Sequence, residues 1–296
     1  MPRSAKILLI VGAVLALLGI ELVRQLPGIA AGGLLYPSRQ PVTVPAPPGC
    51  TNDVFQGAGV RLKGWRCAAQ GEPRGMVVYL HGVADNRASS AGIVPRITSK
   101  GLEMIAYDSR AHGDSEGDVC TYGYFEKEDL RLVLDAIERR PIILIGASLG
   151  AAVALQEAPG DARVAGIVAV DTFSDLQTVA RERAPFGLTE GVIERAFALA
   201  EERGHFRIAD VSPELAAARL EIPVLLIHGT ADTATPPAHS QRVLAALRGP
   251  KRLMLVEGAG HNQALGDPKV WQEIDAWIAA LIGAGSFARN TPPSLQ

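Results

Sequence analysis

The stretch PIILIGASLG fills positions 141–150 and continues into AAVAL at positions 151–155. The apolar, largely β-branched run predicts a buried strand, and the alanine-rich run predicts a helix. Ser148 lies at the bend between them, where Gly146 and Gly150 leave room for a tightly turned backbone. Its hydroxyl would therefore stand at a helix N-terminus, whose free N–H groups and dipole stabilise developing negative charge.

The same G-x-S-x-G pattern occurs a second time, around Ser115. There the neighbours form a polar run over residues 110–118, with no apolar strand before it and no alanine-rich helix after it. Only Ser148 has the strand-to-helix context that a nucleophile elbow requires. We therefore predict Ser148, and not Ser115, as the nucleophile.

Composition and charge limit the possible classes of function. The chain has 296 residues, 48% of them hydrophobic, and a net charge of −2. These values predict one large α/β domain without a second full domain. Lys and Arg are scattered without a basic block, so we expect no nucleic-acid partner. No cysteine or histidine cluster has metal-ligand spacing, so we expect no zinc site.

Residues 1–36 differ from the rest of the chain. Arg3 and Lys6 precede an uncharged apolar run at 7–20, which is short for a membrane span and has the length of a signal-peptide core. We predict an uncleaved membrane anchor that places the catalytic body on the exported, periplasmic or extracytoplasmic side. An N-terminal core helix is disfavoured because the run is apolar on all faces.

Secretion after signal cleavage is the alternative to an anchor. A cleavage context exists near residues 28–30, but Pro27 and the continuing apolar run at 29–35 obscure it.

Cys50 and Cys67 flank two short predicted strands, 52–56 and 60–66, joined by a glycine-containing turn. In such a hairpin the two cysteines lie about opposite one another, within reach of a disulfide. We predict a Cys50–Cys67 bridge, which agrees with an exported protein, and an unpaired Cys120.

Strands and helices alternate after a proline-rich linker at residues 37–48. Most predicted strands are continuous apolar runs, as expected where helices cover both faces of a parallel sheet. The predicted strands after the hairpin are 76–80, 102–107, 142–145, 164–170, 224–228 and 252–256. The predicted helices between them are 88–99, 126–139, 149–158, 238–247 and 268–282.

The segment 173–220 interrupts this alternation and is too long for one crossover. It predicts amphipathic helices at about 176–183, 190–202 and 213–220. We predict a small helical lid inserted before the acid loop; surface helices that only fill a long connection are the alternative. The catalytic domain is predicted to cover residues 37–283, and the polar tail 284–296 to be disordered.

A serine hydroxyl needs a base to take its proton and an acid to orient that base. His261 follows the last predicted strand on a glycine-rich loop, so we predict it as the base. Asp232 follows the strand 224–228 and is the predicted acid, with Asp171 as its rival. The resulting chain order of nucleophile, acid and base is that of nucleophile-elbow hydrolases.

The residues His81, Gly82, Val83 and Ala84 follow the strand 76–80. A glycine-containing turn there can aim a backbone N–H into the site. We therefore assign the oxyanion hole to the amides of Val83 and Leu149, and expect His81 to shape the loop.

Five motifs together resemble an α/β-hydrolase of the lysophospholipase and monoacylglycerol-lipase-like branch. They are YLHG at 79–82, YDSRAHGDSEG at 107–117, GASLG at 146–150, IHGTAD at 227–232 and GH at 260–261. The resemblance covers about residues 54–282. It implies the α/β-hydrolase fold, with an eight-stranded, mostly parallel sheet flanked by helices and a helical cap. Members often carry an N-terminal membrane anchor.

The resemblance also implies hydrolysis of a small-molecule acyl ester through an acyl-serine intermediate, without a cofactor. A serine at the elbow, in place of aspartate, argues against dehalogenase or epoxide-hydrolase chemistry. The expected substrate is a lysophospholipid- or monoacylglycerol-like ester. A peptidase, amidase or thioesterase on the same triad remains an alternative, as does a catalytically silent scaffold that binds a ligand. No oligomeric state follows from the sequence.

Overall fold

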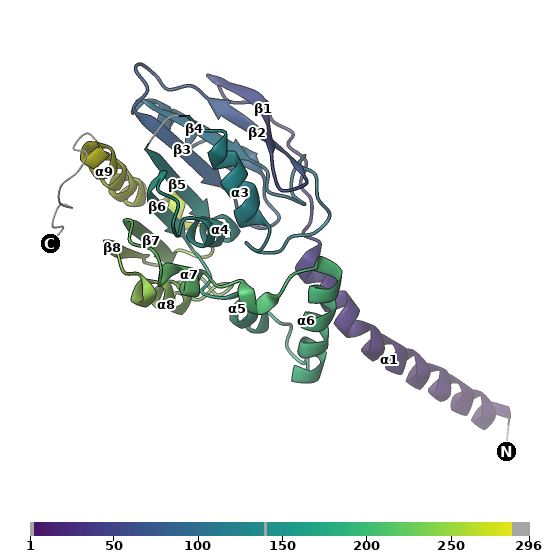
Figure 1. Cartoon of the computed structure of the whole chain (residues 1–296). Helices are drawn as coiled ribbons and strands as arrows, with labels where there is room; N and C mark the ends of the chain where they lie inside the picture. The colour runs from purple at the N-terminus through teal and green to yellow at the C-terminus, as the bar shows by residue number, and fades with distance from the viewer. Residues whose placement is uncertain (1–2, 139–140, 286–296) are drawn as a thin grey trace.

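A single mixed sheet forms the centre of the molecule (Figure 1). The structure is a computed structural model that describes residues 3–138 and 141–285. Within these residues, eight strands lie in the order β1-β2-β4-β3-β5-β6-β7-β8. β2 is antiparallel to β1 and β4, and every other neighbouring pair is parallel. The predicted eight-stranded, mostly parallel sheet is confirmed.

The predicted strands and most predicted helices form within a few residues of their expected bounds. The strands are β1 (Cys50–Gln56), β2 (Arg61–Cys67), β3 (Gly75–Leu80), β4 (Leu102–Tyr107), β5 (Ile142–Ala147), β6 (Val164–Val170), β7 (Val224–Gly229) and β8 (Lys251–Val256). The helices are α1 (Arg3–Leu35), α2 (Val94–Thr98), α3 (Glu126–Asp135), α4 (Leu149–Glu157), α5 (Leu176–Glu182), α6 (Glu190–Gly204), α7 (Pro213–Ala217), α8 (Ala238–Ala246) and α9 (Pro268–Gly285).

One predicted helix was wrong in its extent. In place of a continuous helix at 88–99, the chain forms a 3₁₀ turn at Arg87–Ser90 and then the short α2. Gly92 lies between the two pieces, and Pro95 stands in the first turn of α2. Glycine is a poor helix former and proline has no N–H to donate, so each piece forms separately.

Helices cover both faces of the sheet, which explains the continuous apolar strands. In β3, Val78 and Leu80 belong to the core shared with α3, α4 and α8. Val77 and Tyr79 belong to the opposite core, shared with α2 and α9. Successive strand side chains point to opposite faces, so a strand buried on both sides must be apolar throughout.

The N-terminal helix α1 extends away from the body, and its C-terminal end lies against α6 (Figure 1). Ala31 and Leu35 are fully buried there and belong to the main core. Among the described residues, no helix combines the length and the apolar character that crossing a membrane requires. The membrane span expected within residues 1–36 is therefore not supported. The core-helix alternative for the run at 7–20 is not supported either, because Ile10 and Leu17 are exposed.

Cys50 and Cys67 face each other in the β1–β2 ladder and form the predicted disulfide. Cys120 is a free, buried cysteine. The predicted disordered tail lies outside the described residues, apart from residues 284 and 285, which end α9.

Helices occupy the connection between β6 and β7, as predicted for 173–220. They are α5, α6, a 3₁₀ turn at Ile208–Asp210, and α7. This insertion follows the end of β6, on the same sheet edge as the bend after β5. Figure 1 shows α5 and α6 beside the end of α1.

Candidate active site

Ser148 lies in the sharp turn between β5 and α4, with φ 51° and ψ −109°. A residue with a side chain rarely adopts positive φ, so the surrounding structure must hold this bend. A Cβ on Gly146 would lie 2.4 Å from backbone atoms of Gly150. One on Gly150 would lie 2.1 Å from the Leu80 carbonyl oxygen. Both glycines are therefore required by close backbone approach, as the sequence predicts.

The three residues predicted as nucleophile, base and acid are brought together from three loops. The Ser148 hydroxyl donates to His261 Nε2 over 2.9 Å, and His261 Nδ1 donates to Asp232 Oδ2 over 2.6 Å. Ser148 and Asp232 are each 3% exposed, whereas the His261 side chain is 21% exposed. The predicted base is thus partly exposed, whereas the predicted acid is buried. This geometry can transfer a proton from the hydroxyl to the imidazole.

Asp232 is held as a carboxylate. Burial opposes its charge, but hydrogen bonds with His228 and His261 outweigh burial and lower the Asp232 pKa. The backbone N–H groups of Ala234 and Thr235 also donate to its Oδ1, over 2.9 and 2.8 Å. A charged, fixed carboxylate is the group needed to orient an imidazole and to stabilise the imidazolium.

Asp171, the rival acid, has a different set of partners. Its Oδ1 accepts from Gly229 N over 3.0 Å, and its Oδ2 accepts from Asn262 N over 2.7 Å. Burial is the main cause that raises the Asp171 pKa. Asp171 therefore fastens the end of β7 and the loop after His261. Its position at the end of an apolar strand was the available sequence signal, but this role was missed.

Strained backbone gathers at this edge of the sheet. Besides Ser148, three neighbouring residues with side chains have positive φ: Ala84 at 56°, Asp171 at 50° and Asn262 at 59°. Each such conformation costs on the order of 1–3 kcal/mol and persists only where its surroundings impose it. Strain of this kind is typical of functional sites.

The two predicted oxyanion amides adjoin the nucleophile. Leu149 is the first residue of α4, so its N–H has no acceptor within the helix. Val83 directly follows Gly82, where an added Cβ would lie 3.6 Å from Ser148 Cβ. His81 supports this loop, because its Nε2 accepts from Ser109 N over 2.9 Å and burial lowers its pKa.

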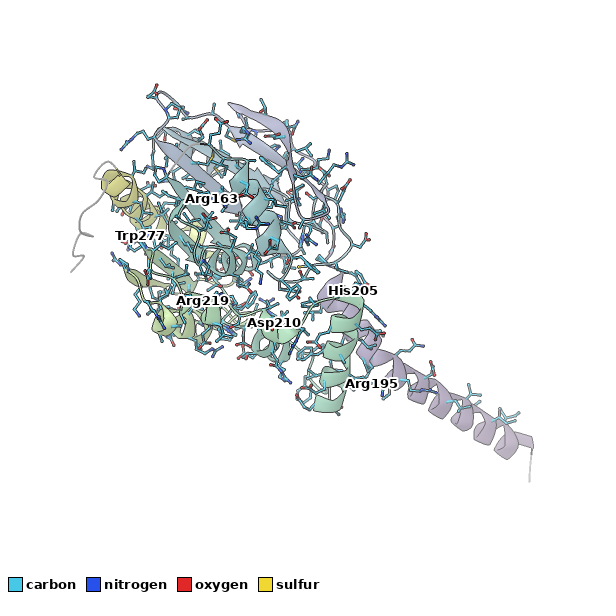
Figure 2. All side chains as sticks on the ribbon, viewed as in Figure 1. Arg163, Arg195, His205, Asp210, Arg219 and Trp277 are labelled. Carbon is cyan, nitrogen blue, oxygen red and sulfur yellow. A yellow bond between two sulfur atoms is a disulfide. The ribbon has the colours of Figure 1, made fainter. Side chains whose placement is uncertain are left out.

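The second serine of the repeated pattern is structural. Ser115 is buried, donates to the Asp108 carbonyl over 2.6 Å and accepts from Lys63 N over 2.8 Å. Its hydroxyl thus forms both of these hydrogen bonds with backbone groups. Of the histidines not predicted as base, His205 lies at the end of α6 (Figure 2) and His239 contacts Glu182.

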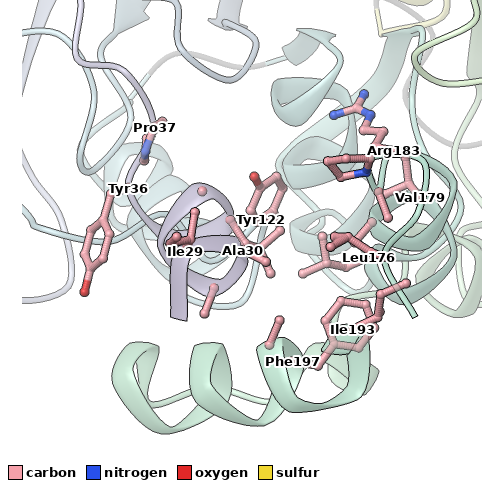
Figure 3. A pocket seen from close by; sticks show the side chains of 18 of the residues that line it. Ile29, Ala30, Tyr36, Pro37, Tyr122, Leu176, Val179, Arg183, Ile193 and Phe197 are labelled. Carbon is pink, nitrogen blue, oxygen red and sulfur yellow. The ribbon is translucent and has the colours of Figure 1, made fainter. Parts of the chain in front are cut away.

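Two pockets lie near the predicted catalytic residues, one beside the loop after β3 and one beside Ala147 and Asn262. A mostly apolar pocket of about 630 Å³ lies beside the loop at Val83, between α1, α5 and α6 (Figure 3). A second pocket of about 400 Å³ is lined by Ala147 and Asn262, next to the nucleophile and base, and includes Asp85 and Arg96. The site thus has an apolar side and a polar side.

Asp171, Asp232 and His261 could offer ligand atoms within 4.8 Å of one another. However, both Asp171 oxygens accept backbone N–H groups, and both ring nitrogens of His261 are engaged within the site. These hydrogen bonds would have to break for a metal ion to bind.

The model of the "Alpha/beta hydrolase family" matches residues 77–271, a range that contains Ser148, Asp232 and His261. The chain belongs to this family. It is 30% identical to the uncharacterized protein YqkD of Bacillus subtilis over 213 residues, covering 69% of this chain and 70% of the relative. It is 26% identical to the uncharacterized protein YfhR of Escherichia coli over 221 residues, covering 71% of this hydrolase and 72% of the relative.

A solved structure has the same fold. The Pyrococcus furiosus esterase Pf2001 superposes with a TM-score of 0.66 at 20% identity, covering 83% of this hydrolase and 98% of that chain. At this identity the likeness extends to the fold alone, so the reaction must be argued from the site.

Proposed function

We propose that this protein is a serine hydrolase that cleaves an acyl ester through an acyl-serine intermediate. The observation that carries the proposal is the continuous hydrogen-bonded path from Ser148 through His261 to Asp232. The proposed substrate is lysophospholipid- or monoacylglycerol-like, in agreement with the resemblance to that branch. The named esterase among the structural neighbours is consistent with this choice.

The proposed reaction has two half-reactions. Ser148 Oγ attacks the ester carbon while His261 Nε2 takes the hydroxyl proton, and the amides of Val83 and Leu149 stabilise the oxyanion. The protonated imidazole then gives its proton to the departing alcohol. Water, deprotonated by His261, attacks the acyl carbon, and Ser148 leaves with the proton as the free acid forms. Asp232 stabilises the imidazolium in both steps, and no cofactor is needed.

The apolar pocket favours an ester over a peptide substrate. Aliphatic and aromatic side chains such as Leu176, Ile193 and Phe197 line it, and these suit a hydrocarbon chain. We propose that the insertion carrying α5 and α6 acts as a lid over this pocket. Comparing turnover of p-nitrophenyl esters, aminoacyl anilides and acyl thioesters tests the proposed ester substrate. Faster turnover of the anilides would identify a peptidase or amidase instead, and faster turnover of the thioesters a thioesterase.

A fluorophosphonate probe tests the nucleophile directly. Wild type should be labelled on the peptide containing Ser148, and Ser148→Ala should lose both labelling and ester turnover. Ser99→Ala, a change of an exposed serine in the turn after α2, is the matched control and should behave as wild type. An unlabelled wild type that still binds substrate would instead support a silent binding scaffold.

We further propose that the catalytic body lies on the exported side of the membrane. The disulfide between Cys50 and Cys67 supports this location, since such bonds persist in oxidising compartments. Cell fractionation with thiol alkylation tests it, including whether the exported protein is held at the membrane or released. A cytoplasmic protein with both thiols free would contradict the proposal.

A further inference from the structure

The apolar pocket is built by segments that are far apart in the sequence. Residues 26–38, at the end of α1 and just after it, supply one side, and α5 and α6 supply the other. Figure 3 shows Ala30 on the face of α1 that meets the cavity, with Leu176 and Phe197 across from it. The N-terminal segment is thus part of the pocket and not only a leader to the domain.

The end of α1 is fastened to the body by more than apolar contact. The Leu35 carbonyl accepts from Cys120 N over 2.9 Å, and the Gly28 carbonyl accepts from Arg203 Nη1 over 3.3 Å. Leu35 is fully buried and also packs close to Gly204 at the end of α6. These bonds place the last turns of α1 in a defined position.

The chain that follows α1 is tied to the loops around the site. Arg39 donates to the carbonyls of Ser115 and Gly117, the second over 2.7 Å. Asn86, two residues after Ala84 in the oxyanion loop, donates from Nδ2 to the Gln40 carbonyl over 3.0 Å. Hydrogen bonds therefore connect the chain after α1 with the loop that follows β3.

The pocket has the chemistry of a hydrocarbon site and reaches the loop that follows β3. Val83, a predicted oxyanion residue, is one of its lining residues. Arg183 is the single charged side chain among the described residues that line it, and its guanidinium donates to the Ala234 carbonyl and the Thr235 hydroxyl. Its charge is thus directed toward the acid loop, and the remaining lining suits an unbranched acyl chain.

We propose that residues 26–35 form a wall of the acyl-binding site that limits the length of the acyl chain, and that the mature enzyme retains them. This inference rests on the proposed ester-hydrolase function. Cleavage near residues 28–30, the alternative considered from the sequence, would remove Leu26 and Ile29 and so break the wall. The wall makes α1 a specificity element of the enzyme.

Ala30→Phe in the full-length chain tests the wall by filling the cavity. Across p-nitrophenyl esters of two to sixteen carbons, kept below aggregation, wild-type kcat/KM should rise about fourfold for each methylene that the pocket buries. The variant should reach its maximum at a shorter chain and lose about tenfold or more on longer esters, with acetyl ester turnover nearly unchanged. Val23→Phe, at an exposed position on α1 outside the pocket, is the control and should keep the wild-type profile.

A second pair of variants tests the facing wall on α6. Ala196 lines the pocket, whereas Ala198 is exposed and does not. Ala196→Leu should shorten the preferred acyl chain, and Ala198→Leu should not. This pair still tests the pocket if the Ala30→Phe variant does not fold.

Probe labelling separates failure of the wall from failure of the function. If the Ala30→Phe variant is folded, fully labelled and keeps the wild-type chain-length profile, residues 26–35 do not limit the acyl chain. Wild type without labelling or ester turnover would overturn the proposed function itself. Intact mass of the protein isolated from its native cells should include residues 26–35; a mature chain beginning anywhere after residue 26 would overturn their retention.

Discussion

Asp232 and Asp171 are both buried at the edge of the sheet, but only Asp232 accepts a hydrogen bond from the His261 ring. Asp171 accepts backbone N–H groups from two loops instead. Asp232 thus contacts the predicted base, whereas Asp171 holds the loops that carry Asp232 and His261. The sequence favoured Asp232 over its rival Asp171, and in the structure Asp232 is the one that contacts the imidazole.

This difference predicts distinct effects of removing each charge. Asp232→Asn should lower kcat for a p-nitrophenyl ester by about 10⁴-fold, because the histidine tautomer is no longer held. Asp171→Asn should lower kcat by only about tenfold and cost roughly 1–3 kcal/mol of unfolding free energy, because its amide N–H₂ would face a backbone N–H. Steady-state kinetics and urea unfolding measure the two effects. Equal losses of kcat would contradict the assignment of Asp232.

Glu157, at the end of α4, predicts a pH-dependent stability away from the site. Burial, followed by the nearby Asp161, raises its pKa from 4.5 to about 8. A carboxyl with a raised folded pKa stabilises the fold while it is protonated, so this contribution is complete below about pH 4.5 and is lost as the pH rises through about 8. Urea unfolding between pH 5 and 9 measures it.

Glu157→Gln removes this titration and provides the comparison. The variant should gain stability over wild type as the pH rises, on the order of 2 kcal/mol at pH 9. Parallel stability curves for the two proteins would exclude a raised Glu157 pKa.

At the scale of elements, the hairpin of β1 and β2 forms the antiparallel edge of the sheet, far in strand order from β7 and β8. Its register pairs Cys50 with Cys67 directly, which is why the spacing alone predicted the bond. The split of the predicted helix at 88–99 shows the opposite case. There an apolar pattern favoured one helix, whereas Gly92 and Pro95 decided the local backbone.

The disulfide should stabilise the fold without supporting catalysis. The cysteines are 17 residues apart, and closing a loop of this size is worth about 3 kcal/mol in the chain-entropy account. Cys50→Ser/Cys67→Ser should lower the unfolding free energy by about this amount and leave kcat/KM of the folded protein unchanged. Reductant should destabilise wild type but not the double variant; an equal response of both would show that the bond contributes nothing.

At the scale of the whole molecule, the insertion between β6 and β7 contacts both the N-terminal helix and the acid loop. Arg183, at the end of α5, donates to the Ala234 carbonyl over 2.7 Å and also to the Thr235 side chain. Ala234 and Thr235 in turn donate their backbone N–H groups to Asp232. The proposed lid therefore supports the loop that holds Asp232, the predicted acid.

This link predicts that Arg183→Met lowers kcat/KM by about tenfold for short and long acyl esters alike, because the acid loop loses its support. The matched control is Arg195→Met, an exposed arginine on α6 (Figure 2), which should retain wild-type kinetics. A chain-length screen with both variants checks this. A loss restricted to long esters would assign Arg183 to the pocket wall instead.

The sequence alone determined the features that depend on neighbouring residues. The strand, bend and helix around Ser148, the apolar strands and the Cys50–Cys67 hairpin all follow from local patterns and backbone sterics. The order of Asp232 and His261 after later strands follows from the edge that parallel strands share. The tertiary structure decided that Asp171 fastens two loops and that the end of α1 lines the apolar pocket. An apolar helix is expected to pack against another surface, but only the tertiary structure shows which surface that is.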